Sequence, residues 1–351
     1  MAHIWVRAEQ RDNETRVGVT PEGAKSLLAR GMCVTVEASE SRVISTEAYA
    51  HVGCDIAETG TWPNAPAEAI VFGLKELPED GTPLPHRHIL FGHAYKGQAS
   101  GRVLLERFKA GGGTLYDLES LVDETGRRVA AFGYWAGYAG AAVSLIAWIA
   151  QQNGGVCGAV EAYRDKDALL EDLGGRLARL GSSRPSAIVI GAKGRVGTGA
   201  KDLLVAIGSS VTEWDMEETA HGGPFPEILA HDIFVNSIFA REGTPVFVPK
   251  EALAAPRKLS VIGDVACDPD SAFNPIPLYD RATSWSDPVL RAHDTPPLDV
   301  MAIDNLPSLL PLESSEDYAA QLLPTLQSAV DLTGSVWTRA LAEFHKHSAD
   351  L

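Results

Sequence analysis

Two groups of residues in this chain have the types and spacing that chemistry requires, and they lie in different halves of the sequence. In the second half, the apolar run Ala187–Ile190 ends at Gly191. Gly194 and Gly197 then repeat the glycine at three-residue intervals, before the helix-compatible stretch Ala200–Ile207. A strand, a glycine turn and a helix in that order present backbone N–H groups to a pyrophosphate. The spacing G-x-x-G-x-x-G is not the common G-x-G-x-x-G, so a glycine turn without a ligand stays an alternative.

An acidic residue in the right place indicates which dinucleotide this turn would bind. Asp215 ends the next apolar run, about twenty residues after the glycines. A carboxylate there accepts hydrogen bonds from both hydroxyls of an adenosine ribose and repels a 2′-phosphate. The following residues, Met216–Thr219, contain no arginine that would bind such a phosphate. The pairing of Asp215 with the glycines therefore favours NAD(H) over NADP(H), and over a solvated strand end.

The first half of the chain places cations and acid–base groups directly after its apolar runs. These groups are Arg7, Arg11, Arg16, Lys75, Glu76, His93, Lys96, Glu119, Arg127 and Arg128. In doubly wound sheets, the carboxyl ends of the strands form the edge where ligands bind. So many cations in a chain of net charge −16 predict a substrate with several carboxylates.

Lys75 and His93 are the candidates for acid–base catalysis at this edge. Hydride transfer from a carbon that bears nitrogen gives an imine, which must then take up water. That chemistry needs a base for the amine and an acid–base group for hydration and for collapse of the carbinolamine. A lysine whose pKa is lowered by neighbouring cations and a histidine suit these roles. The alternatives are a solvated Lys–Glu pair and a structural histidine.

Metal, membrane and nucleic-acid functions are not expected. The spacing of His86, His88 and His93 fits no common metal site. The acidic balance argues against nucleic acid and anionic membranes as partners. Four scattered cysteines, with no C-x-x-C and no secretory signal, predict reduced thiols in a cytoplasmic protein.

One uncharged segment is long enough to be weighed as a membrane span. It runs from 129 to 160, and Ala136–Ala150 is almost wholly apolar. Its many glycines and alanines favour close packing against protein instead. We therefore expect a buried helix that joins two domains.

Alternation of apolar runs with helix-like stretches predicts an α/β fold throughout. The 351 residues, 45% of them hydrophobic, predict two doubly wound, Rossmann-like domains with a central cleft. The expected strands are His3–Arg7, Cys33–Glu37, Ala69–Gly73, His88–Phe91, Thr114–Tyr116, Ala187–Ile190, Val211–Trp214, Ile233–Asn236 and Leu259–Asp264. The expected helices are Thr20–Arg30, Ser45–His51, Gly97–Ala110 and an amphipathic region, Glu313–Phe344. Thr20 and Pro21 predict the start of the first helix as N-cap and first helical residue.

Taken together, these residues resemble a known family: the NAD-dependent, lysine-forming saccharopine dehydrogenases of the alanine dehydrogenase/transhydrogenase superfamily. The resemblance covers nearly the whole chain and is carried by many short segments in order. They include Arg7–Glu9, Gly73–Glu76, His93–Lys96, Gly113–Glu119, Gly126–Gly133, Gly191–Ala200, Gly222–Phe225, Asn274–Pro277 and Ile303–Pro311. The resemblance implies oxidation of saccharopine by NAD to L-lysine and 2-oxoglutarate.

The resemblance also implies roles for individual residues. Lys75 would be the base that accepts the proton of the secondary amine, and His93 the acid–base catalyst of imine hydrolysis. The remaining substrate-side residues that it implies are Arg16, Glu76, Lys96, Glu119, Arg128 and Phe132. Those on the cofactor side are Gly191, Gly194, Arg195, Val196, Gly197, Asp215 and Asp304.

The chain departs from the family pattern at two positions. Val196 stands where relatives carry a cysteine, and Arg11 where they carry a lysine. The family fold further implies a discontinuous first domain. We thus expect residues 1–132 and 315–351 to form the substrate domain and residues 133–314 the NAD domain.

Two other functions remain open from the sequence. One is a sister dehydrogenase that acts on alanine or on another N-linked dicarboxylate. The other is an NAD(H)-binding subunit without chemistry of its own. The expected partners are small molecules, and the chain is expected to be a monomer or a small homo-oligomer.

Overall fold

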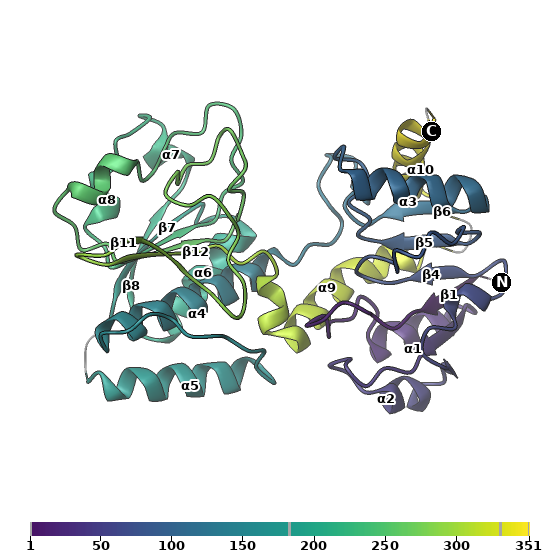
Figure 1. Cartoon of the computed structure of the whole chain (residues 1–351). Helices are drawn as coiled ribbons and strands as arrows, with labels where there is room; N and C mark the ends of the chain where they lie inside the picture. The colour runs from purple at the N-terminus through teal and green to yellow at the C-terminus, as the bar shows by residue number, and fades with distance from the viewer. Residues whose placement is uncertain (1, 182–183, 330–331, 350) are drawn as a thin grey trace. The chain divides into compact units, whose positions relative to one another are not determined.

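The computed structural model describes residues 2–181, 184–329, 332–349 and 351, and these form two compact units. The first unit comprises residues 1–131 and 311–351, and the second comprises residues 132–310. Each unit is an α/β structure with its own six-stranded sheet (Figure 1). The chain thus leaves the first unit and returns to it after completing the second.

The first unit is built on a fully parallel sheet with the strand order β3-β2-β1-β4-β5-β6. Its strands are β1 (His3–Val6), β2 (Cys33–Glu37), β3 (Asp55–Ala57), β4 (Ile70–Phe72), β5 (Arg87–Leu90) and β6 (Thr114–Asp117). The order reverses between β1 and β4, which pair with each other. The loops that follow these two strands therefore flank the switch point, where doubly wound sheets bind ligands.

The helices of this unit begin and end at recognisable signals. They are α1 (Pro21–Ala29), α2 (Thr46–His51), α3 (Ala99–Gly111), α9 (Pro311–Leu326) and α10 (Ser335–Ser348). Thr20 is the N-cap of α1, as predicted, and its hydroxyl accepts from the Gly23 amide at 3.2 Å. Gly112 ends α3 in the left-handed conformation, φ 76°.

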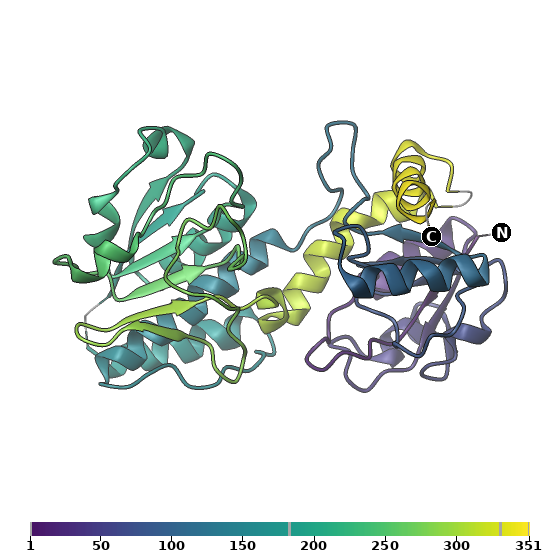
Figure 2. The same cartoon turned by 45° about the horizontal axis from the view of Figure 1, so that its top comes forward.

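The C-terminal region is two helices, where the sequence analysis predicted one amphipathic helical region. The helix α9 ends at Leu326, and α10 begins at Ser335 after Gly334. Glycine at this point starts a new helix with an extended N-cap. Both views place α10 beside α3 (Figures 1 and 2).

The second unit is built on a sheet of five parallel strands and one antiparallel edge strand. The order is β11-β12-β10-β9-β7-β8, and β11 pairs antiparallel with β12. The strands are β7 (Ser186–Ile190), β8 (Ser210–Trp214), β9 (Ile233–Asn236), β10 (Val261–Asp264), β11 (Leu290–His293) and β12 (Leu298–Met301). The sequence analysis found β7 to β10 but not β11 and β12. Here the switch point lies between β7 and β9, which pair with each other in the sheet although β8 separates them in the sequence.

The helices of the second unit cover this sheet. They are α4 (Gly133–Gln152), α5 (Lys166–Arg179), α6 (Arg195–Ala206), α7 (Met216–Thr219) and α8 (Pro226–Leu229). The prediction of a helix from Ala200 was wrong at its start, because α6 begins at Arg195 with Gly194 as an extended N-cap. Gly197 therefore lies inside the helix. The helix α5 was not predicted.

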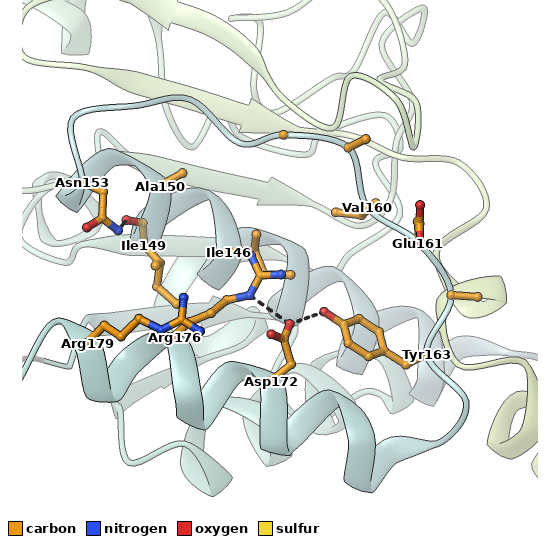
Figure 3. A pocket seen from close by; sticks show the side chains of 13 residues that line it. Ile146, Ile149, Ala150, Asn153, Val160, Glu161, Tyr163, Asp172, Arg176 and Arg179 are labelled. Carbon is orange, nitrogen blue, oxygen red and sulfur yellow. Dashed lines mark hydrogen bonds and ion pairs between the residues drawn. The ribbon is translucent and has the colours of Figure 1, made fainter.

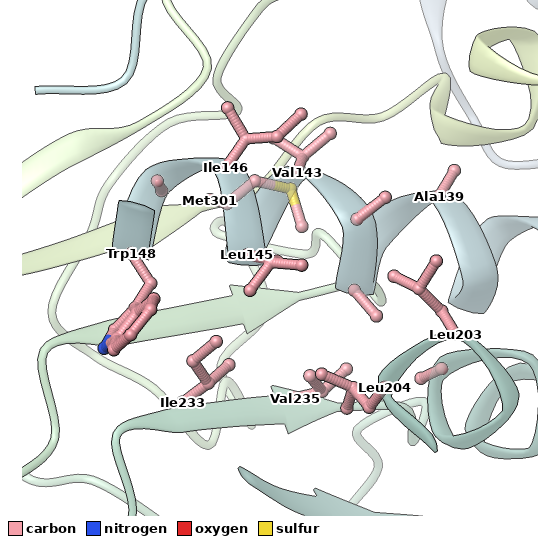
Figure 4. Close-up of a cluster of buried hydrophobic side chains, with 14 of the residues drawn as sticks. Ala139, Val143, Leu145, Ile146, Trp148, Leu203, Leu204, Ile233, Val235 and Met301 are labelled. Atoms are coloured by element: carbon pink, nitrogen blue, oxygen red, sulfur yellow. The ribbon is translucent and has the colours of Figure 1, made fainter. Parts of the chain in front are cut away.

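The apolar helix α4 is buried in the second unit, as the sequence analysis expected. Every residue from Gly137 to Ile149 is buried, and the side chains of α4 pack with those of α6, β9 and β12 (Figure 4). Glycines permit the close approach: a Cβ on Gly137 would lie 1.8 Å from the Val196 carbonyl oxygen, and one on Gly199 1.9 Å from that of Tyr134. Of the helices that the structure describes, none is long and apolar enough to cross a membrane.

Candidate functional site

The loop that carries Lys75 follows β4 and is fixed by a buried ion pair from the loop after β1. Arg7 and Glu9 lie 3.3 Å apart, with the Arg7 side chain fully buried. The Glu9 carboxylate accepts from the amides of Leu74 at 2.6 Å and Lys75 at 3.0 Å, and Arg7 donates to the Lys75 carbonyl. A Cβ on Gly73 would lie 2.3 Å from Arg7 Nε, so glycine is required there. The backbone of Lys75 is thus held rigidly at the switch point.

A second buried ion pair, Glu14 with Arg16, lies in the loop after β1. It is bidentate, with Arg16 Nε 2.7 Å and Nη2 2.5 Å from the two carboxylate oxygens. Burial acts most strongly on Glu14 and disfavours its charge, but the hydrogen bonds and charge of Arg16 outweigh it and lower the Glu14 pKa. The structure confirms no role for Arg16, but it places this guanidinium close enough to Lys75 for their charges to interact.

The Lys75 amine is shifted toward its neutral form. Burial lowers its pKa most, and the charges of Arg16 and Arg11 lower it further, against the opposing charges of Glu14 and Glu76. Arg11 and Glu76 form an exposed ion pair at 3.3 Å. A half-buried lysine with a lowered pKa suits a general base, because its neutral amine is available closer to neutral pH.

His93 lies in the loop after β5, at the centre of a second charged cluster. It has a positive φ of 47°, and its ring stacks at 6.1 Å on that of Phe91. Its Nδ1 lies 3.6 Å from Glu119 Oε2, and Lys96 Nζ lies 3.1 Å from the same oxygen. Arg128 Nη1 is 3.9 Å from Glu119 Oε1. The close contact with His93 contributes most to lowering the Glu119 pKa, to about 2, so Glu119 is an anion between three basic groups.

The two clusters share one edge of the sheet. The Phe91 amide donates to the Leu74 carbonyl at 3.0 Å, which joins the ends of β4 and β5. The Leu118 amide donates to the Leu90 carbonyl at 3.0 Å, which joins the ends of β5 and β6. The structure therefore brings Arg16, Lys75, Glu76, His93, Lys96, Glu119 and Arg128 to the carboxyl edge of the first sheet.

Sequence reasoning missed several groups at this edge. Glu14 pairs with Arg16, and Asp117 ends β6 with one oxygen accepting from the Glu119 amide at 2.9 Å. Burial raises the Asp117 pKa to about 6. The position of Asp117 directly after an apolar run could have identified it, because Glu119 was found from the same kind of position. Tyr318 of α9 comes from the far end of the chain, and no sequence signal linked it to this edge; its ring packs 6.0 Å from that of Phe91.

The histidines weighed as metal ligands have different surroundings. His88 is buried between the rings of Trp62 and Phe108, and burial lowers its pKa to about 3. His86 Nε2 lies 3.0 Å from the Ala65 carbonyl oxygen. Only His93 of the three lies in the charged cluster.

The glycine turn of the second unit borders a pocket of about 750 Å³ at the switch point of its sheet. Gly191 and Gly194 line it on one side and residues 237–241, which follow β9, on the other. Gly191 has φ 86°, which favours glycine. A Cβ on Gly197 would lie 2.2 Å from the Gly191 carbonyl oxygen, so this glycine lets α6 begin directly against the turn. These features fit a pyrophosphate at the N-terminus of α6.

Asp215 lines the same pocket at the end of β8. Its carboxylate accepts from the amides of Lys193, at 3.1 Å, and Met216, at 2.9 Å. The first bond ties the acid to the glycine turn, and the second caps α7. Asp215 therefore has a structural role besides the one proposed for it in binding ribose.

Five of the expected residues do not line this pocket or join the first cluster; one is Gly197, which packs behind the turn against the Gly191 carbonyl. Arg195 and Val196 occupy the first turn of α6, and Val196 faces Gly133 of α4. Asp304 is exposed after β12, where its charge acts on Cys267. Phe132 is the N-cap residue of α4 and belongs to the second unit.

Comparisons with known proteins identify the class of this fold. Residues 5–139 match the family described as alanine dehydrogenase/PNT, N-terminal domain. A solved L-alanine dehydrogenase has a TM-score of 0.72 and 18% sequence identity, covering 99% of each chain. The transhydrogenase from Sinorhizobium meliloti has a TM-score of 0.63 at 18% identity, covering 94% of each chain. The fold is therefore that of the alanine dehydrogenase/transhydrogenase class.

Closer relatives define the family within that class. Saccharopine dehydrogenase [NAD(+), L-lysine-forming] of Yarrowia lipolytica is 44% identical over 98% of this chain and 97% of its own length. The proteins of the same description from Candida glabrata and Schizosaccharomyces pombe are 42% and 43% identical over 99% and 96% of this chain, and cover 97% and 96% of their own lengths. The chain belongs to the family of NAD(+)-dependent, L-lysine-forming saccharopine dehydrogenases.

Proposed function

We propose that this chain oxidises saccharopine with NAD(+) and water to L-lysine, 2-oxoglutarate and NADH. The observation that carries the proposal is the placement of Lys75, a lysine with a lowered pKa, among the cations at the switch point of the first sheet. Saccharopine has three carboxylates and one secondary amine. A cation-rich edge with one basic amine matches both features.

The second unit supplies the cofactor site in this proposal. The glycines and Asp215 would hold the pyrophosphate and the adenosine ribose of NAD. NAD supplies the acceptor for the hydride that leaves the carbon next to the secondary amine. Arg195 and Val196 would contribute to NAD binding through the backbone of the first turn of α6. Asp304 would act through the effect of its charge on the cofactor site. The first unit would then bind the substrate.

The residues of the first unit would handle the protons. Lys75, as the neutral amine, accepts the proton of the secondary amine, and the positive charge of Arg16 favours the neutral form of Lys75 before that transfer. His93 takes a proton from the water that adds to the imine carbon and returns one to the departing lysine nitrogen. Glu119, whose carboxylate oxygen lies 3.6 Å from His93 Nδ1, orients the imidazole.

The substrate carboxylates would be bound by arginines. Arg16 and Arg128 present guanidinium forks, which bind carboxylates through two parallel hydrogen bonds. Lys96 and Glu76 would balance the charge around the substrate. Alanine, with one carboxylate, would leave several of these groups unused, so the sister-dehydrogenase alternative is not favoured.

We further propose that the chain works in the cytoplasm, as a monomer or small homo-oligomer with small-molecule substrates. All four cysteines are free thiols, two of them buried, which suits a reducing compartment.

The replacement Lys75→Met tests the proposal. It removes the base while keeping an unbranched side chain, and we expect turnover of saccharopine to fall by about 10²–10⁴-fold. NADH binding, followed by its fluorescence, should stay unchanged. The exposed lysine of α3, in the variant Lys109→Met, serves as the control. Full saccharopine turnover by Lys75→Met, or turnover of alanine but not saccharopine by the unaltered protein, would refute the proposal.

A further inference from the structure

A second pocket of the second unit has no part in the function proposed above. It measures about 860 Å³ and lies between the C-terminal half of α4, segment 158–163 and α5 (Figure 3). Its size is in the range of sites that hold small molecules. The two arginines that line it both come from α5, at positions 176 and 179. The pocket therefore combines enough space for a ligand with two arginines on one wall, and two acidic residues, Asp172 and Glu161, also line it.

Arg176 is oriented by partners on one side only. Its Nε donates to Asp172 Oδ2 at 2.9 Å, and the Tyr163 hydroxyl donates to the same oxygen at 2.6 Å. Asp172 thus holds the guanidinium plane in place (Figure 3). Among the residues that the structure describes, none accepts a hydrogen bond from the two terminal nitrogens. A fixed guanidinium with free terminal donors is suited to bidentate binding of an anion.

Arg179 adds a second cation to the same wall. It follows Arg176 by three residues, so both lie on one face of α5. It is exposed and forms no ion pair within the described part of the chain. Glu161 belongs to the opposite segment, and its side chain points away from α5 (Figure 3). The wall that faces the pocket from α5 carries two arginines and one aspartate, Asp172, so its net charge is +1, in a chain of net charge −16.

The opposite wall is aliphatic. Ile146 and Ile149 of α4, with Val160, line it. A ligand that fits both walls has an anionic group and an apolar body.

The pocket is separate from the dinucleotide site. The first residue of α4, Gly133, faces Val196 in the first turn of α6. The pocket lies 13 to 20 residues further along α4, at Ile146–Asn153. At 1.5 Å per residue that is about 20–30 Å away.

We propose that this pocket binds a small organic anion, with a carboxylate or phosphate group on the two arginines and an apolar body against α4. The site belongs to the second unit alone, so it is independent of how the first unit binds substrate.

The experiment uses the full chain saturated with NADH and saccharopine, so that the proposed substrate and cofactor sites are filled. Phenyl phosphate and benzoate are titrated by ligand-observed NMR, and benzyl alcohol serves as the neutral counterpart. We expect at least one anion to bind more tightly than the alcohol. The stronger of the two identifies phosphate or carboxylate as the recognised group.

Two variants and a control localise the binding. Arg179→Gln should lower the affinity for the anion by about tenfold or more, since a hydrogen bond from a charged group is lost. Gly158→Trp should block the pocket, because a Cβ there meets open space. Arg281→Gln removes an exposed arginine that pairs with Asp280, and should leave binding unchanged. Absence of anion binding, binding that survives both pocket variants, or an equal loss in Arg281→Gln would overturn the proposal.

Discussion

The charged residues around Lys75 shift its pKa in opposite directions. The effect of each can therefore be tested by the direction in which its replacement moves that pKa. Arg11 and Arg16 lower the pKa of this lysine, while Glu14 and Glu76 raise it. Arg11 and Glu76 are exposed, so they can be replaced with little effect on folding. They are the appropriate residues with which to tune the base.

We expect Arg11→Gln and Glu76→Gln to shift the pH profile in opposite directions. A general base acts in its neutral form, so kcat/KM for saccharopine oxidation rises with pH through the Lys75 pKa. Losing the Arg11 cation raises that pKa and moves the rising limb to higher pH. Losing the Glu76 anion moves it to lower pH. Full pH profiles of kcat/KM measure both shifts, and two limbs that move the same way would contradict the assignment of Lys75.

Asp117 predicts a pH dependence of stability. Its folded pKa of about 6 lies above the unfolded value of about 3.9, so the folded state holds the proton more tightly. The free energy of unfolding therefore falls as pH rises through this window, by about 3 kcal/mol from this group. Asp117→Asn keeps the oxygen that accepts from the Glu119 amide and removes the titration. The difference in free energy of unfolding between Asp117→Asn and the unaltered protein should favour the variant more at pH 7 than at pH 4.5. Urea unfolding at the two pH values tests this, and an equal difference at both would exclude it.

At the scale of elements, the glycine turn depends on how closely α4 and α6 approach. Gly137 and Gly199 stand where a Cβ would overlap a carbonyl oxygen of the other helix. The apolar stretch that resembled a membrane span is thus a packing surface. It holds the first turn of α6 against the turn that borders the dinucleotide pocket.

We expect Gly137→Ala to destabilise the protein by about 1–3 kcal/mol or more, because the added methyl group forces the helices apart. NADH affinity should fall with it, since the N-terminus of α6 moves. Gly174→Ala on α5 is the matched control: its Cβ meets open space, and alanine should stabilise that helix by up to about 1 kcal/mol. Thermal melting and NADH titration report the two effects. Equal stability of the two variants would show that the close approach is not required.

At the scale of the whole molecule, the last forty residues complete the unit that the first residues begin. Trp337 of α10 is fully buried and packs edge-on against Tyr116 of β6 at 5.6 Å. Phe344 packs against Phe108 of α3 at 5.9 Å. The core of the first unit is therefore incomplete without the side chains of α10.

Trp337→Ala should lower the free energy of unfolding of the first unit by about 3–5 kcal/mol and leave that of the second unit unchanged. Calorimetry is expected to show one transition at lower temperature, while NADH still binds to the second unit. Thr338→Ala on the exposed side of the same helix should shift stability by less than about 0.5 kcal/mol. Loss of NADH binding in parallel with the first transition would argue against separate stability of the units.

Much of this organisation was predictable because it depends on local rules. Short apolar runs of three to six residues followed by polar groups predicted nine of the strands and the edge where the charged residues gather. Thr20 and Pro21 predicted the start of α1 through capping chemistry alone. The charged residues proposed for substrate binding and catalysis were found by their position after strands, which needs no knowledge of tertiary contacts.

The tertiary structure decided what depends on distant partners. The sequence by itself determined the α/β class and the glycine turn with Asp215, and it singled out Lys75 and His93 as candidates for acid–base chemistry, since residue type and spacing carry that information. It did not determine that Glu14 forms an ion pair with Arg16, that Glu9 fixes the Lys75 backbone, or that α6 begins at Arg195. Nor did it reveal the pocket beside Arg176 and Arg179. Burial and charge at each of these places come from segments that only folding brings together, and burial and charge set a pKa or shape a pocket.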